Sequence, residues 1–262
     1  MNFETIRLER DARGIATVTL ARPDKHNAMN ARMIAELDEA ARDLGEDADV
    51  RAVVLAAEGR SFCAGGDLGW MREQAEKDRA GKMAEARALA AMLGAWNALP
   101  KPVIARVQGA AYGGGVGMIA VCDIAVAAGH ARFGLTETRL GLIPATIGPF
   151  VVRKMGEAFA RQVFFNARPF GTEFALRAGL IARAVADDGL DAAIEEEASA
   201  FLECAPGAVA DAKALARRLG GQDPQELAEM TANALADRWE TDEAQAGIAA
   251  FFSRQTPPWK AG

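Results

Sequence analysis

The sequence is poor in the residues on which the commonest catalytic and metal sites depend. Only two of its 262 residues are histidines and three are serines, and neither a G-x-S-x-G nor an H-E-x-x-H motif occurs. Its three cysteines lie far apart and form no C-x-x-C pair. This composition argues against a serine hydrolase, a metal site and a disulfide-stapled domain, and it is typical of a reducing compartment.

Two further features are missing: an excess of basic residues and a long apolar run. Asp and Glu number 36 against 30 for Lys and Arg, which gives a net charge of -6 and argues against a nucleic-acid partner. No apolar run reaches the ~18 residues that a membrane span needs, and the first ten residues lack the pattern of a targeting segment. We therefore expect a cytoplasmic protein with no nucleic-acid or membrane partner.

Glycine, in contrast, is abundant. The chain has 26 glycines, or roughly 10% of its residues against an average of about 7%, and the excess lies between Gly59 and Gly148. The remaining composition, 50% hydrophobic and 25% charged, is that of a globular protein. A chain of this length fits one large domain with an appended subdomain.

Hydrophobic periodicity predicts an α/β protein with a mostly parallel sheet. An N-terminal hairpin precedes a helix for which Asn30 is the expected N-cap. Apolar runs predict strands at 51–57, 103–109, 122–128 and 180–185, and helical spacing predicts helices at 30–44, 82–99, 149–165, 172–178, 190–203, 206–218, 224–239 and 242–253. Strand, glycine turn and helix follow one another twice, which favours parallel pairing. We place a boundary near residue 190, between a core at 1–190 and a helical region at 191–262.

Two glycine clusters, at 65–66 and 113–117, each follow a strand and precede a predicted helix or apolar stretch. Neither matches the dinucleotide fingerprint or the phosphate-binding P-loop. Tight turns with close packing explain such clusters about as well as function does. If both clusters present backbone N–H groups to one point, however, they would form an oxyanion hole.

Five motifs, in order along nearly the whole chain, resemble the crotonase superfamily, also called the enoyl-CoA hydratase/isomerase family. They are K-H-N-A-M-N (25–30), R-S-F-C-A-G-G-D-L (60–68), Q-G-A-A-Y-G-G-G-V-G (108–117), C-D-I-A-V-A (122–127) and R-F-G-L-T-E-T-R-L-G-L-I-P (132–144). The resemblance implies a spiral of repeated ββα units and a C-terminal helical trimerisation region. It also implies an acyl-CoA thioester substrate and no cofactor, since coenzyme A is part of the substrate.

The resemblance assigns roles to particular residues. Gly66 and Gly114 would supply the oxyanion-hole amides, and Glu137 would be the acid–base residue. Trp70 and Met71 would shape the acyl pocket, although core packing explains them equally well. Further substrate contacts would fall on His26, Ala28, Ala64, Gly65, Asp67, Leu68 and Gly117, with Arg22 and Lys25 as candidate phosphate partners.

This sequence departs from the best-known hydratases of the family at one position. Those enzymes carry two glutamates twenty residues apart, whereas here Gly117 stands at the first position and only Glu137 at the second. A glutamate after Thr136 could also simply stabilise a helix dipole. In the catalytic role, burial among apolar residues would raise the Glu137 pKa and suit proton transfer near neutral pH.

A single glutamate leaves the reaction open. One carboxylate suffices to move a double bond, which would favour a 3-enoyl to 2-enoyl-CoA isomerase. The motifs nevertheless resemble most closely the bacterial methylglutaconyl-CoA and isohexenylglutaconyl-CoA hydratase branch, so we expect a hydratase for a branched substrate, whose distal carboxylate Arg72 or Arg139 would bind. A non-catalytic acyl-CoA-binding protein is the remaining alternative.

The C-terminal helices resemble the part of the family that forms trimers. This implies a homotrimer or a dimer of trimers, in which Phe251 and Arg254 would reach the coenzyme A of a neighbouring subunit.

Overall fold

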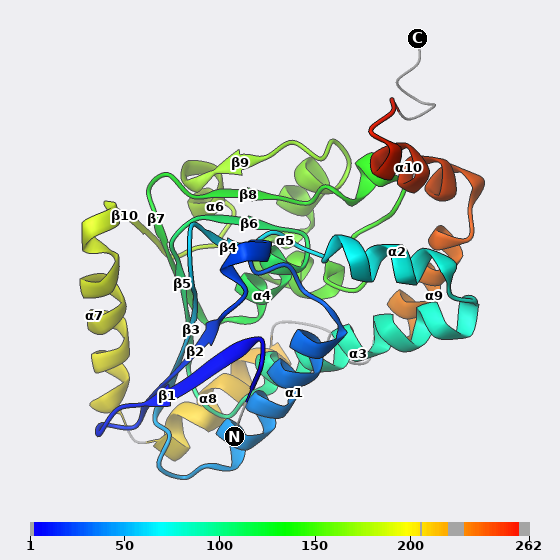
Figure 1. The fold of residues 1–262 in the computed structure, drawn as a ribbon. Coiled ribbons are helices and arrows are strands. Elements are labelled where there is room, and N and C mark those ends of the chain that lie inside the picture. Colours follow the sequence, from blue (N-terminus) through cyan, green and yellow to red (C-terminus); the bar gives the residue numbers. More distant parts are fainter. Residues whose placement is uncertain (1–2, 205, 220–227, 257–262) are drawn as a thin grey trace.

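A computed structural model describes residues 3–204, 206–219 and 228–256 (Figure 1). Its main sheet has six strands in the order β1-β2-β3-β5-β7-β10. The strands are β1 (Ile6–Arg10), β2 (Ile15–Leu20), β3 (Ala52–Ala57), β5 (Val103–Val107), β7 (Ile124–Ala128) and β10 (Arg183–Val185). Only β1 and β2 pair antiparallel, as the predicted hairpin, and the other neighbours are parallel. The predicted α/β class with a mostly parallel sheet is confirmed.

A second, smaller sheet holds the strands that follow those of the main sheet. Its order is β4 (Ser61–Cys63), β6 (Ala110–Tyr112), β8 (Arg132–Gly134) and β9 (Phe170–Gly171). Each of the pairs β3–β4, β5–β6 and β7–β8 therefore splits between the two sheets and leads into helical structure (Figure 1). This repeat of ββα units is the spiral that the motifs predicted.

The helices cover both sheets. They are α1 (Ala31–Glu46), α2 (Leu68–Glu76), α3 (Arg79–Ala98), α4 (Gly114–Val121), α5 (Gly148–Phe164), α6 (Thr172–Arg177), α7 (Leu190–Leu202), α8 (Pro206–Leu219), α9 (Ala228–Trp239) and α10 (Asp242–Ser253). Asn30 caps α1 as predicted, because its side-chain oxygen accepts from the Met33 amide at 2.9 Å. The sequence patterns did not predict α2, and β10 is shorter than the strand expected at 180–185.

The C-terminal helices pack on different parts of the molecule. Helix α7 packs against β3, β5 and β7, so the first helix beyond residue 190 covers the main sheet. Helix α9 lies along α3, and α10 contacts the short 3₁₀ helix η2 (Glu137–Leu140). The division of the chain near residue 190 stays a prediction.

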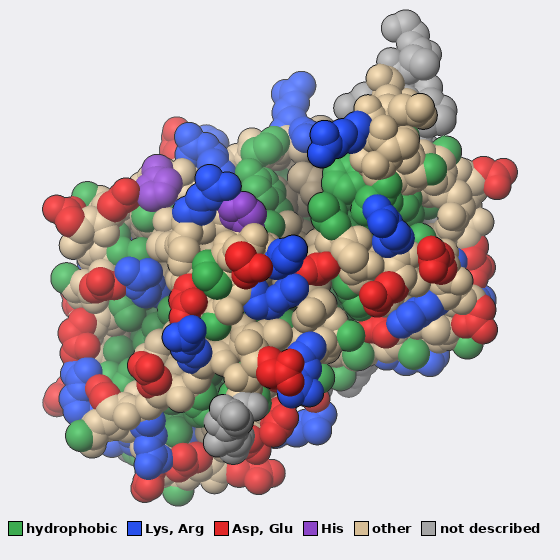
Figure 2. Space-filling view, in the orientation of Figure 1, with side chains coloured by type: hydrophobic (Ala, Val, Ile, Leu, Met, Phe, Trp, Pro, Cys, Tyr) green, Lys and Arg blue, Asp and Glu red, His purple; other side chains and the backbone are tan. Residues whose placement is uncertain are grey.

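The surface view of one face shows acidic and basic side chains interspersed rather than separated by sign (Figure 2). Among the described helices, none is both long and apolar enough to cross a bilayer.

Candidate active site

Two cavities meet at the residues that the sequence singled out. The inner cavity, of about 140 Å³, lies between α2, α3, α9 and the segment before α5. The outer cavity, of about 590 Å³, lies between the 64–68 segment, η2 and α10. The residues that line both are Gly66, Met71, Gly114, Glu137 and Leu142. The structure therefore brings the two predicted oxyanion glycines and the predicted acid–base residue together.

The backbone around Gly66 turns its amide away from a neighbouring segment. Met29 donates to the Gly65 carbonyl at 2.7 Å, and Asp67 donates to the Met29 carbonyl at 2.8 Å. Because successive N–H groups of an extended chain point in opposite directions, the Gly66 amide points away from Met29. Among the described residues it has no acceptor.

Gly114 begins α4, so its amide belongs to the first turn, whose N–H groups have no acceptor within the helix. The helix dipole makes this end attractive to negative charge. The preceding residue, Gly113, has a φ of +47° and donates to the Gly134 carbonyl at 2.9 Å. This turn places the N-terminus of α4 where the two cavities meet.

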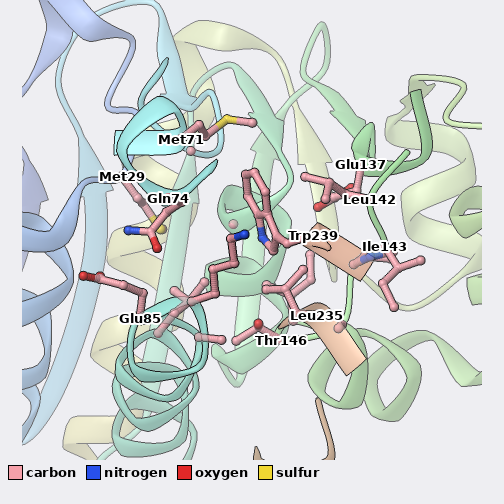
Figure 3. A pocket seen from close by; sticks show the side chains of 18 of the residues that line it. Met29, Met71, Gln74, Glu85, Glu137, Leu142, Ile143, Thr146, Leu235 and Trp239 are labelled. Atoms are coloured by element: carbon pink, nitrogen blue, oxygen red, sulfur yellow. The ribbon is translucent and has the colours of Figure 1, made fainter. Parts of the chain in front are cut away.

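Glu137 is the first residue of η2, and its carboxylate lacks hydrogen bonds that its burial would call for. Its Oε2 atom is buried and has no hydrogen-bond partner among the described residues. Burial raises its pKa from 4.5 to about 7, against a smaller lowering by its own backbone amide. The apolar residues Leu142 and Ile143 line the inner cavity with it (Figure 3), and so does Trp70. A carboxyl group of this kind can both accept and return a proton near neutral pH.

Gly113 also decides how near Glu137 can come to the helix. A Cβ atom on Gly113 would lie 3.2 Å from Glu137 Oε1. The missing side chain therefore makes room for the carboxylate, a role that the sequence patterns did not separate from turn formation.

Gly117 does not line either cavity. Ile147, the residue before α5, covers it, and a Cβ atom on Gly117 would lie 2.6 Å from Ile147 Cγ2. An apolar side chain therefore fills the place in front of Gly117, and the substrate contact predicted for this residue stays a prediction. Ile147 itself lines the inner cavity.

The other predicted substrate contacts fall into two groups. Ala64, Gly65 and Leu68 line the outer cavity, and Trp70 lines the inner one, with Met71 in both. The others, His26, Ala28 and Asp67, line neither cavity, and their predicted substrate contacts stay predictions.

These three residues make contacts with other parts of the chain. Asp67 caps α2 and forms an ion pair with Arg22 at 2.9 Å, while Arg22 also donates to the Ala28 carbonyl at 2.6 Å. The His26 ring lies 3.1 Å from the Ser61 hydroxyl. Arg22 therefore holds the loop before α2, and its role as a phosphate partner stays a prediction.

Phe251 and Arg254 line the outer cavity of their own chain. Helix α10 contacts η2 within the single chain, and the predicted contact of these two residues with a neighbouring subunit stays a prediction. Arg139 lines the same cavity, whereas Arg72 lies over the Phe252 ring, 4.4 Å from its centroid, and lines neither cavity.

Three kinds of comparison show which known proteins this chain is similar to. The model of the family described as enoyl-CoA hydratase/isomerase matches residues 10–262. The chain is similar to a short-chain-enoyl-CoA hydratase of Clostridium acetobutylicum, with 30% identity over 97% of each chain.

Two solved structures are also similar. A crystal structure of an enoyl-CoA hydratase from Mycobacterium avium has 32% identity and a TM-score of 0.87, covering 98% of this chain and 99% of that one. One from Mycobacterium smegmatis has 37% identity and a TM-score of 0.80 over the same shares.

Proposed function

Because the chain belongs to the enoyl-CoA hydratase/isomerase family, we propose that it adds water across the 2,3 double bond of an acyl-CoA thioester. The observation that supports this proposal most directly is the position of Glu137. Its carboxyl group, with a pKa of about 7, lines both cavities. Gly66 and Gly114 line the same two cavities, and their backbone amides have no acceptor among the described residues.

The two cavities suit the two halves of such a substrate. The acyl group would enter the inner, mostly apolar cavity, and the coenzyme A portion would lie in the outer one, where Arg139 and Arg254 offer positive charge. The thioester oxygen would then lie between the Gly66 and Gly114 amides. Removal of one such donor typically costs about 3 to 4 kcal/mol of transition-state stabilisation.

In the proposed reaction Glu137 removes a proton from water as the water oxygen bonds to C3. The π electrons of the double bond move toward C1 and give an enolate, whose oxygen accepts hydrogen bonds from both amides. Glu137 then returns the proton to C2, so that the net change is the addition of one water. This sequence uses one carboxylate twice and calls for no cofactor or metal ion.

We further propose a branched, methylglutaconyl-like acyl group. The support is the resemblance of the motifs F-C-A-G-G-D-L-G-W-M and R-L-G-L-I-P-A-T-I-G-P-F-V-V to that branch of the family. We also propose a homotrimer or a dimer of trimers, which light scattering on the purified protein would test.

One observation favours the isomerase as a second candidate. Ile147 in front of Gly117 replaces a second carboxylate with an apolar wall, which gives water fewer partners. A protein that only binds acyl-CoA is the third candidate, and the unpaired Glu137 Oε2 argues against it.

The experiment that separates these candidates measures the conjugated thioester absorbance with crotonyl-CoA, 3-methylglutaconyl-CoA and a 3-enoyl-CoA. Loss of absorbance with either 2-enoyl ester supports the hydratase. A gain with the 3-enoyl ester alone would instead show the isomerase, and no change with any ester would leave only binding.

A further inference from the structure

The inner cavity is lined by a lysine for which the described residues provide no counter-charge. Lys82 lies on α3 and is 8% exposed, and it lines the inner cavity but not the outer one. Of the residues that the structure describes, none forms an ion pair or a side-chain hydrogen bond with Lys82. An ammonium group that no neighbouring acid neutralises can bind an anionic group that enters the cavity.

The position of Lys82 follows from the periodicity of α3. Lys82, Glu85, Ala86 and Leu89 lie at helical spacing and all line the cavity. Helix α9 closes the same space with Leu235 and Trp239. Figure 3 shows Glu85 and Glu137 on opposite sides of the cavity. Lys82 therefore belongs to the wall of the cavity that α3 forms.

The other charges that face this part of the cavity do not neutralise Lys82. Glu85 forms an ion pair with Lys77 and accepts from Trp70 Nε1 at 3.3 Å. Lys77 and Glu85 balance each other, so one positive charge remains in this wall. Glu137 is the other acid that lines the cavity, and its role lies at the thioester end.

A second polar group in the same cavity also lacks a partner. The Thr146 Oγ1 atom is buried and has no hydrogen bond among the described residues. An ammonium group and a hydroxyl group that both lack partners among the described residues are donors that a carboxylate accepts from. An entirely apolar acyl chain would leave both unsatisfied, at a cost in binding free energy.

We infer that Lys82, with Thr146 as a second donor, binds a carboxylate on the acyl group, so that the preferred substrates are thioesters of dicarboxylic acids. This inference rests on the acyl-CoA binding of the proposed function and specifies its substrate class. It assigns the carboxylate to a residue other than Arg72, which lies over Phe252, and Arg139, which lies in the outer cavity.

Calorimetric binding of two saturated esters, glutaryl-CoA and butyryl-CoA, tests this inference without any turnover. We expect the wild-type protein to bind glutaryl-CoA at least about tenfold more tightly. Lys82→Met keeps the length of the side chain and removes its charge, so this variant should lose the preference. Arg87→Met is the matched control, since Arg87 lies on the same helix, pairs with Glu229 and lines neither cavity.

Equal binding of the two esters by the wild-type protein would overturn the inference and leave acyl-CoA binding intact. A preference that survives in Lys82→Met would overturn the assignment to Lys82. Failure of both esters to bind would contradict the proposed function itself. If Lys82→Met does not fold, the wild-type comparison still decides the substrate class, and Lys82→Arg should retain the preference.

Discussion

Ile147 occupies the space in front of Gly117 so closely that no side chain fits there. A Cβ atom on Gly117 would lie 2.6 Å from Ile147 Cγ2 and 3.0 Å from Ile147 Cβ. Helices α4 and α5 pack together at this point. Gly117 stands at the position where the best-known hydratases carry their first glutamate. The same residue lets α5 approach α4, because it has no side chain.

This contact predicts the behaviour of Gly117→Ala. Alanine in a helix normally stabilises it by about 0.5 to 1 kcal/mol relative to glycine, but overpacking against Ile147 costs about 1 to 3 kcal/mol. We expect net destabilisation in urea unfolding. In the double variant Gly117→Ala/Ile147→Ala, which removes the Cγ2 atom of residue 147, the loss should be smaller than the sum of the single losses. Additive losses would contradict direct contact.

The raised pKa of Glu137 predicts how stability depends on pH. The folded state holds the proton up to a pKa of about 7, whereas the unfolded chain releases it near 4.5. The contribution of this group is thus fully present below about pH 4.5 and is lost as the pH rises through 7. Glu137→Gln should remove this loss, on the order of 3 kcal/mol. The measurement is urea unfolding of both proteins from pH 5 to 8, and parallel curves would contradict burial of the charge.

Gly113 predicts a variant that acts through Glu137. In Gly113→Ala the new Cβ atom lies 3.2 Å from Glu137 Oε1, at a backbone φ of +47°. We expect a stability loss of about 1 to 2 kcal/mol and at least a tenfold loss of kcat. Gly156→Ala is the control, because its φ is +72° and its Cβ atom meets nothing within 4 Å. That control should lose similar stability and keep its activity, and equal activity losses would contradict a role of Gly113 at the carboxylate.

The parts of the fold that local sequence determines could be predicted. The Asn30 cap, the hairpin and the buried strands β3, β5 and β7 have signals within one element, namely a capping side chain, alternation and apolar runs. Helix α2 has no such signal beyond Asp67, which the resemblance assigned to substrate contact.

What could not be predicted depends on contacts between distant segments. Ile147 meets Gly117 across thirty residues of sequence, and only the packing of α5 on α4 shows it. In the sequence, Lys82 is simply a basic residue of an alanine-rich helix. Only the tertiary structure shows that α2 and α9 enclose it. The return of α10 to its own chain likewise depends on tertiary packing, since η2 and α10 lie about a hundred residues apart in sequence.

The central claim is that Glu137 alone exchanges the proton, and the pH dependence of crotonyl-CoA hydration tests it most directly. We predict that kcat/KM falls as the pH decreases through about 7, because protonation removes the base, and that Glu137→Gln lowers kcat by about a thousandfold. A Glu137→Gln variant that hydrates crotonyl-CoA at the wild-type rate, with the same pH profile, would contradict the account.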